Sequence, residues 1–261
     1  MLVLLPPSEG KATAVRGRPL ALDRLSLPAL TDARAAVLDE LVRLCEGAGE
    51  DGGKAAEVLG LTPGLHGEIA KNARLRTAPT LPAADLYTGV LYDALGLATL
   101  DPAALRRARR SVLVFSGLWG ALRLTDRVPS YRCSMGVRLP GTGGLAGYWR
   151  PHLDDVLPEV AGRGLVLDLR SSAYAAAWKP PAALASRTAT VRVLQVTVVA
   201  GVEKRSVVSH FNKATKGTLL RALLTEGADP KTPSALAAAL RDLGFEVEHP
   251  GNGPQLDVLL R

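Results

Sequence analysis

The 261-residue chain has little cysteine and no long apolar run, and both absences limit what it can be. Its two cysteines, Cys45 and Cys133, lie far apart, with no cysteine or histidine at ligand spacing. A disulfide scaffold is therefore excluded, and a structural zinc site has no support. No stretch approaches the roughly 18 consecutive apolar residues of a membrane-spanning helix. We expect a cytoplasmic protein with reduced thiols and no membrane association.

Metal and cofactor motifs are also missing. The histidines have no companion at metal or catalytic-triad spacing; they are His66, His152, His210 and His249. Paired histidine and carboxylate ligands, which an iron site needs, do not occur. The start of the chain, MLVLLPPSEGK, has four apolar residues after Met1 and no basic residue before them, so no secretion signal is predicted. We expect no metal and no cofactor.

No phosphate-binding motif is complete. Lys11 and Lys54 each follow a glycine, but the upstream glycine of a P-loop is absent. Residues 141–146 match G-x-G-x-x-A, yet Pro140 interrupts the preceding strand and no acidic residue follows at the required distance. Ser8 and Lys11 match S-x-x-K but follow two prolines at a strand end, which argues against a serine acyl-enzyme and for a phosphate anchor.

Positive charge is concentrated in one part of the chain. The net charge is +7 and the isoelectric point about 9.7. Residues 101–150 hold nine arginines and two aspartates, with no lysine or glutamate, so this window alone accounts for the net charge. A local excess of this kind favours a polyanionic partner. A general bias of the proteome toward arginine is the alternative.

The chain is predicted to be a single α+β domain over residues 1–261, with mixed sheets flanked by helices, because no linker or repeat divides it. A strand at 112–115 ends in a tight turn between Gly117 and Gly120, whose backbone N–H groups we expect to be exposed. Further strands are predicted at 2–5, 85–90, 164–169, 190–199, 206–209, 245–248 and 256–260, and the strand at 85–90 is expected to turn at Gly89 into a short helix. Helices are predicted from Thr31 or Asp32 to Cys45 and at 54–59, 65–76, 102–110, 147–157, 211–226 and 233–243. Asp101 is expected to cap the helix at 102–110, with Pro102 at its first position.

Lys213 and Lys216 are three residues apart on the first turns of a predicted helix, so they share one face. A lysine is unfavourable at a helix N-terminus unless an anion also binds there. The pair therefore indicates a ligand, while an ordinary solvated helix face is an equal alternative. Asp168 follows a buried strand, where it would position a base or a hydroxyl, or cap the next helix.

Several segments, taken in order, resemble the YaaA family of bacterial peroxide-stress-resistance proteins along nearly the whole chain. They are PPSEGK (6–11), LYTG (86–89), FSGLWGALR (115–123), Asp126, Tyr131-Arg132, MGVRL (135–139), Tyr148-Trp149, the block Leu169, Ser172, Tyr174, Lys179 and Pro180, and the set Ser209, Lys213, Lys216 and Gly217.

That resemblance implies a cytoplasmic α+β protein of unusual topology with a basic cleft. Family members are associated with lowering free iron and limiting oxidative damage to DNA. They are described as binding duplex DNA through the cleft and a helix-hairpin-helix-like element. The turn between Gly117 and Gly120 is the candidate for that hairpin here, and we expect a monomer.

Two functions follow as expectations. The first is binding of double-stranded DNA without sequence specificity, through Lys11, Ser116, Gly117, Gly120, Arg123, Arg127, Arg132, Lys179, Lys213 and Lys216. The alternative is an enzyme acting on a nucleotide or small phosphorylated metabolite in the same cleft. Its pocket would be formed by Ser8, Glu9, Thr88, Asp168, Ser171 and Ser172, at strand ends where α/β proteins commonly bind ligands.

Overall fold

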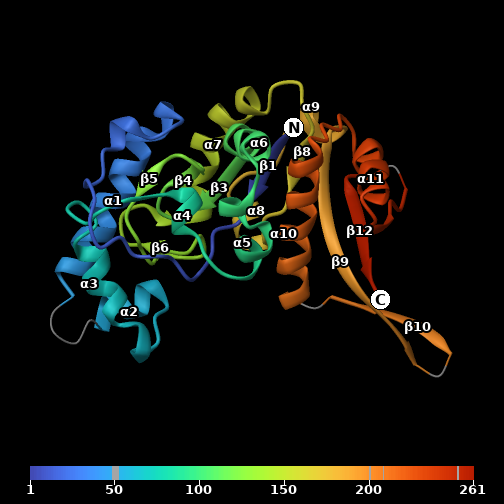
Figure 1. Ribbon diagram of the computed structural model, residues 1–261. Coiled ribbons are helices and arrows are strands. Elements are labelled where there is room, and N and C mark those ends of the chain that lie inside the picture. The colour runs from blue at the N-terminus through green and yellow to red at the C-terminus, as the bar shows by residue number, and fades with distance from the viewer. Residues whose placement is uncertain (49–52, 200, 208, 252) are drawn as a thin grey trace.

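The computed structural model describes residues 1–48, 53–199, 201–207, 209–251 and 253–261. Strand β1 (Leu2–Leu5) lies in the middle of an eight-stranded sheet, with β3 (Val112–Ser116) on one side and β8 (Val166–Asp168) on the other (Figure 1). The strand order is β11-β12-β9-β8-β1-β3-β4, with β10 paired to β9. The sheet is mixed and flanked by helices, as the sequence predicted.

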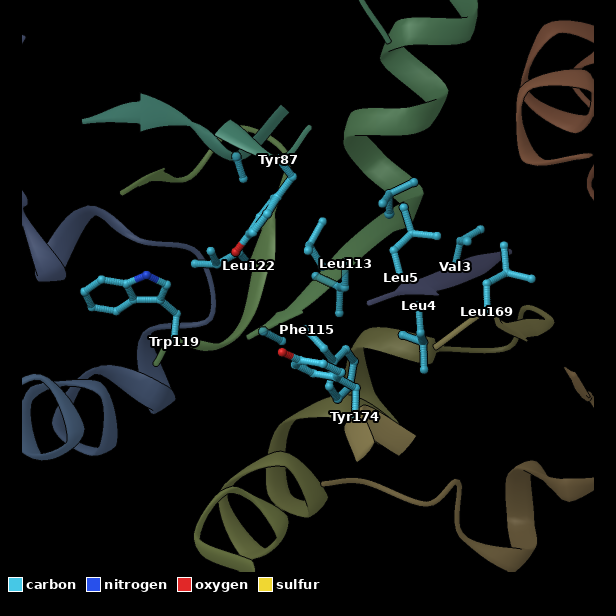
Figure 2. Close-up of a cluster of buried hydrophobic side chains, with 14 of the residues drawn as sticks. Val3, Leu4, Leu5, Tyr87, Leu113, Phe115, Trp119, Leu122, Leu169 and Tyr174 are labelled. Atoms are coloured by element: carbon cyan, nitrogen blue, oxygen red, sulfur yellow. The ribbon is translucent and has the colours of Figure 1, made fainter. Parts of the chain in front are cut away.

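The apolar sequence of β1 explains its central position. All four of its residues are at most 3% exposed, and it pairs in parallel with both neighbours, with Val3 opposite Val112 and Leu167. A parallel strand is covered on both faces, which requires a continuous apolar run. Figure 2 shows Val3, Leu4 and Leu5 beside Leu113 in this core. Because the three strands are parallel, their carboxyl ends lie at one edge, where residues 6–11 leave the sheet.

The C-terminal part of the sheet extends as an arm. Strand β9 (Thr188–Val199) is parallel to β8 and to β12 (Gln255–Leu260), and β11 (Glu246–Glu248) closes this side. Strand β10 (Val202–Ser206) pairs antiparallel to β9 and projects from the body (Figure 1). The return strand predicted at 206–209 therefore begins earlier, because the turn at Gly201, with φ of 77°, leads straight into it.

Helix α10 (Ser209–Glu226) packs closely on α5 (Val90–Leu95). A Cβ on Gly217 would clash with the carbonyl oxygen of Leu91, so only glycine permits this approach. The contact brings the first turns of α10 beside residues 88–90.

The other helices are α1 (Thr31–Glu46), α2 (Gly53–Leu59), α3 (Gly67–Ala73), α4 (Ala83–Leu86), α6 (Pro102–Ser111), α7 (Leu145–Ala161), α8 (Ser172–Ala175), α9 (Ala182–Ala185) and α11 (Pro233–Asp242), with 3-10 turns η1 (Leu22–Arg24), η2 (Pro28–Leu30), η3 (Pro63–Leu65) and η4 (Leu97–Thr99). The remaining strands are β4 (Gly120–Arg123), which pairs with β3, and the two-stranded pairs β2 (Leu81–Pro82) with β5 (Arg127–Val128) and β6 (Arg138–Leu139) with β7 (Gly143–Gly144).

The predicted strand at 85–90 is wrong, whereas the short helix predicted after Gly89 is confirmed as α5. Asp85 and Leu86 belong to α4, whose first N–H groups donate to the carbonyls of Asp126 and Leu124. Only Tyr87 makes a β-type contact, an isolated antiparallel bridge with Lys11. The backbone of this segment finds its partners in a helical turn and a single bridge, so no strand forms.

A buried guanidinium joins α1 to the hairpin formed by β3 and β4. Arg34 is fully buried, and its donors reach the carbonyls of Trp119 at 3.1 Å and Ala121 at 2.7 Å. It also donates to the carbonyl of Ser26 at 2.8 Å. Burial lowers the pKa of Arg34, and the nearby carboxylate of Asp126 opposes that shift.

Replacing Arg34 with methionine would keep the side-chain volume while leaving these carbonyls buried without donors. We expect Arg34→Met to lower the free energy of unfolding by about 3 kcal/mol, measured by urea denaturation. The exposed Arg16, replaced in the same way, should change it by less than about 0.5 kcal/mol. Equal stability of the two variants would contradict the role given to Arg34.

Candidate functional site

A pocket of about 340 Å³ opens at the carboxyl edge of the sheet. Its walls come from the chain leaving β1, the start of α5, the chain leaving β8 and the first turns of α10. It is called the strand-end pocket here and is lined by Pro6, Pro7, Ser8, Glu9, Gly10, Thr88, Gly89, Val90, Leu91, Tyr92, Ser171, Tyr174 and Lys213. Five residues that the sequence indicated therefore meet in one cavity: Ser8, Glu9, Thr88, Ser171 and Lys213.

Hydrogen bonds fix the loop after β1 against the start of α5. The Ser8 hydroxyl donates to the carbonyl of Gly10 at 2.5 Å and accepts from the N–H of Thr88 at 3.1 Å. The hydroxyl of Tyr92, on α5, donates to the carbonyl of Pro6 at 2.6 Å. These contacts hold one wall of the pocket in place before any ligand binds.

Lys11 lies directly behind this wall. Its ammonium donates to the carbonyl of Ser8 at 2.8 Å and lies 4.6 Å from the centre of the Tyr131 ring and 5.8 Å from that of Tyr87. Burial lowers the pKa of Lys11 to about 8, with Glu9 raising it and Arg132 lowering it further. A lysine with this pKa exchanges a proton near neutral pH.

A chain of buried hydroxyl groups runs beneath Lys11. The hydroxyls of Tyr87 and Tyr131 are 2.9 Å apart, and that of Tyr131 is 2.6 Å from the Ser116 hydroxyl. Burial raises the pKa of both tyrosines, so they remain protonated and able to donate. Tyr87 and Tyr131 were not among the residues predicted for the site. Both tyrosines belong to motifs singled out in the sequence, LYTG and Tyr131-Arg132, and this could have pointed to them as site residues.

Arg132 closes the side of the site next to Glu9. Its guanidinium lies 2.5 Å from the Glu9 carboxylate, which is 66% exposed. The backbone of Arg132 exchanges two hydrogen bonds with the side chain of the buried Asn72, at 2.8 and 2.9 Å. Asn72 was missed from the sequence, where an isolated asparagine in a helix carries no signal. Arg132 is thus held beside the loop at 8–11.

The turn between Gly117 and Gly120 does not present free amides. Its predicted hairpin exists, as the connection from β3 to β4, but all four residues are buried. The N–H groups of Leu118 and Trp119 donate to the Ser116 hydroxyl at 3.2 and 3.0 Å. Because a bonded, buried amide is unavailable to phosphate, the expectation of exposed N–H groups is wrong. The turn also joins two strands, so it is not the hairpin of a helix-hairpin-helix element.

The two glycines serve packing instead. A Cβ on Gly117 would lie 2.7 Å from the carbonyl oxygen of Cys133, and one on Gly120 would lie 2.7 Å from the ring of Trp149. Trp149 also donates to the carbonyl of Gly117 at 2.8 Å. The glycine spacing that indicated a phosphate-binding turn is explained by this close contact.

Asp168 is committed to an ion pair and does not line the pocket. Its carboxylate accepts from the Arg170 guanidinium at 2.8 and 2.6 Å, and the Arg170 side chain is fully buried. Lys216 is also turned inward, donating to the carbonyl of Leu169 at 3.3 Å. Ser172 begins α8 and is exposed outside the pocket. The structure thus separates Asp168 and Ser172 from Ser171, although the three are close in sequence.

The predicted arginines do not gather around the same cavity. Arg123 lies opposite Leu113, at the end of β3 away from Ser116, and donates to the carbonyl of Arg110 at 2.6 Å. Arg127 donates to the carbonyl of Thr80 at 2.8 Å and lines a different pocket. Lys179 is exposed. Of the predicted basic residues, Lys213 lines the strand-end pocket, while Lys11 and Arg132 contact residues that line it.

Metal-binding groups are sparse in the part of the chain that the structure describes. No three histidine, cysteine, aspartate or glutamate side chains lie close enough there to hold a metal ion. The side chain of His210 lies outside the described residues. Within the same described ranges, no helix is both long and apolar enough to cross a bilayer.

The lowered pKa of Lys11 is directly testable by NMR. In protein labelled at the lysine ε-carbon, the signal that disappears in Lys11→Arg should titrate near pH 8, against 10.5 for an ordinary lysine. Since the folded pKa lies below the unfolded value, the protonated amine lowers stability below pH 8, and that penalty is relieved as the pH rises toward 10.5. The free energy of unfolding of Lys11→Met should therefore exceed that of the wild type by more at pH 7 than at pH 10. An NMR titration midpoint near 10.5 would show that the Lys11 amine is solvated.

Comparison with known proteins places the chain in a family. The family model described as "Peroxide stress protein YaaA" matches residues 1–250. A UPF0246 protein of Streptomyces coelicolor is 63% identical over 265 aligned positions, which cover 100% of this chain and 98% of that protein. A UPF0246 protein of Corynebacterium efficiens is 42% identical over 252 positions, covering 95% of each.

A more distant relative, an uncharacterized protein of Campylobacter jejuni, is 31% identical over 146 positions, covering 56% of this chain and 54% of that protein. Three of the motifs that carried the resemblance, at 6–11, 86–89 and 209–217, contribute lining residues to the strand-end pocket. The chain belongs to the YaaA family of peroxide stress proteins, also called UPF0246.

Proposed function

We propose that this peroxide stress protein binds a small phosphorylated metabolite, of the mononucleotide class, in the strand-end pocket. The observation that carries the proposal is the convergence of hydroxyl groups, a carboxylate and a lysine from four separate segments on one cavity. Its volume of about 340 Å³ is within the usual range of small-ligand sites, roughly 300–1,000 Å³. A surface that only supports the fold has no need of this convergence.

The pocket has separate features for a phosphate and for a ring. Lys213 lies exposed at one wall and forms no ion pair with a carboxylate of the described residues, so it is free to bind an anion. Ser8, Thr88 and Ser171 add hydroxyl groups. Tyr92 stacks on Tyr87 with ring centres 5.6 Å apart and also lines the cavity, which gives a rigid aromatic wall for a base or sugar.

Lys11 contributes in two ways. Its protonated form adds positive charge behind the loop that lines the pocket, which favours an anionic ligand. With a pKa near 8, a fraction of the amine is neutral at physiological pH and can take up a proton. This fits the alternative in which the bound metabolite is transformed rather than only held.

Non-specific binding of duplex DNA is the second candidate, and the charge distribution favours it. Residues 101–150 carry an excess of seven positive charges, and Arg127, Lys179 and Lys213 are exposed. Such groups bind phosphates without reading sequence. Arg123 and Arg127 lie away from the strand-end pocket, so a duplex would have to contact a broader surface than that cavity.

A thermal-shift screen with mononucleotides tests the first function. One nucleotide at about 100 times its Kd should raise Tm by roughly 5 °C or more, because a ligand that binds only the folded state stabilises it. Lys213→Ala should abolish the shift, whereas Lys204→Ala, an exposed lysine on β10, should retain it. If no mononucleotide shifts Tm, or if both variants respond like the wild type, the pocket does not bind this class.

DNA binding is tested by its dependence on salt. The double variant Lys179→Ala/Lys213→Ala should weaken binding to all duplexes about equally, and the slope of log K against log salt should fall by about two. The double variant Lys204→Ala/Lys231→Ala removes the same charge elsewhere and should leave the slope unchanged. Equal slopes for the two double variants would remove Lys179 and Lys213 from any DNA-binding surface.

A further inference from the structure

A second and larger cavity, of about 490 Å³, lies between the segment at 18–25 and strand β5. It shares no lining residue with the strand-end pocket. The cavity, called the arginine pocket here, is lined by Arg18, Pro19, Leu20, Ala21, Arg24, Leu25, Thr80, Thr125 and Arg127. The proposed metabolite site does not use it, and of its lining residues only Arg127 was named for the DNA-binding candidate.

Three guanidinium groups line this cavity without a counter-charge. Arg18 and Arg24 come from the segment at 18–25 and Arg127 comes from β5, and all three are exposed. None of them forms an ion pair with a carboxylate of the described residues, and Asp23, next to Arg24, makes no such pair either. Asp126 is buried and accepts instead from the backbone N–H groups of Ser26 and Arg123. Three like charges around one cavity favour an anionic ligand.

The cavity is partly pre-organised through one buried residue. Thr80, 1% exposed, donates from its N–H and its hydroxyl to the carbonyl of Arg18, at 3.1 and 2.9 Å. The Arg127 guanidinium donates to the carbonyl of the same Thr80 at 2.8 Å. Thr80 thus holds both the backbone of Arg18 and the guanidinium of Arg127 in place. The other N–H groups of Arg127 have no hydrogen-bond partner among the described residues, so they are left for a ligand.

The rest of the lining is mainly apolar. Leu25 is 4% exposed and forms part of the core, and Pro19, Leu20 and Ala21 continue the same wall. A bare inorganic ion would leave this surface without a partner. Guanidinium forks bind phosphoryl oxygens in bidentate fashion, and the apolar wall suits an organic group.

We propose that the arginine pocket binds a small organic phosphate, with a phosphoryl head carrying two or more charges and an apolar body. A DNA phosphodiester carries a single charge on a polar sugar backbone, which matches three guanidiniums over an apolar wall less well. The site is independent of the strand-end pocket, so either can fail without the other.

Titration calorimetry with phenyl phosphate and inorganic phosphate tests this. Phenyl phosphate should bind roughly tenfold more tightly, because its ring buries apolar surface against the pocket wall. Arg24→Ala should weaken phenyl phosphate binding about tenfold or more, and it should not disturb folding because the Arg24 side chain is exposed. Arg18→Ala/Arg127→Ala should remove binding.

Arg16→Ala is the matched control, since Arg16 is exposed two residues before Arg18 but does not line the cavity. It should bind phenyl phosphate as the wild type does. The proposal would be overturned if Arg16→Ala lost as much phenyl phosphate affinity as Arg24→Ala, or if phenyl phosphate and inorganic phosphate bound equally tightly. It would also be overturned if Arg18→Ala/Arg127→Ala bound phenyl phosphate as the wild type does. Displacement of phenyl phosphate by a short duplex at lower concentration would assign these arginines to a nucleic-acid surface instead.

Discussion

Strand β1 pairs in parallel with both β3 and β8, and this pairing sets where the following segments of the chain lie. A strand with neighbours on both sides and helices over both faces must be apolar throughout, and residues 2–5 meet that condition with at most 3% exposure. Pro6 and Pro7 end the strand, and residues 8–11 therefore lie at the edge where β3 and β8 also end. The strand-end pocket forms where the chains leaving β1 and β8 meet the start of α5 and the first turns of α10.

Two groups of cationic side chains have different roles in this structure. Arg34 and Arg170 are buried, and each is satisfied by carbonyls or a carboxylate, so they act as structural connectors. Lys213 and the three arginines of the arginine pocket are exposed at cavities and have no carboxylate partner among the described residues. The net charge of +7 therefore includes buried structural cations as well as exposed cations that remain open to anions.

Local features were predicted well wherever a short segment determines its own structure. Asp101 accepts from the N–H groups of Ala103 and Ala104 and caps α6, with Pro102 at its first position, as their order in the sequence indicates. The β3–β4 turn was also predicted, but its environment was not. Whether its amides are exposed depends on Ser116 and on Trp149, which is distant in sequence and packs on Gly120. The strand predicted at 85–90 failed similarly, because the partners of its backbone lie at 124–126.

Apolar runs, caps and ordered motifs are local properties, so the family, the mixed sheet flanked by helices and the kinds of side chain at the strand ends could be predicted from the residues alone. Which polar groups meet depends on how the chain folds. Ser8, Thr88, Ser171 and Lys213 share a pocket although they are far apart along the chain, whereas Asp168, three residues from Ser171, is paired with Arg170. Whether a charged group is left unpaired depends on the groups within a few ångströms of it, and these neighbours are not set by distance along the chain.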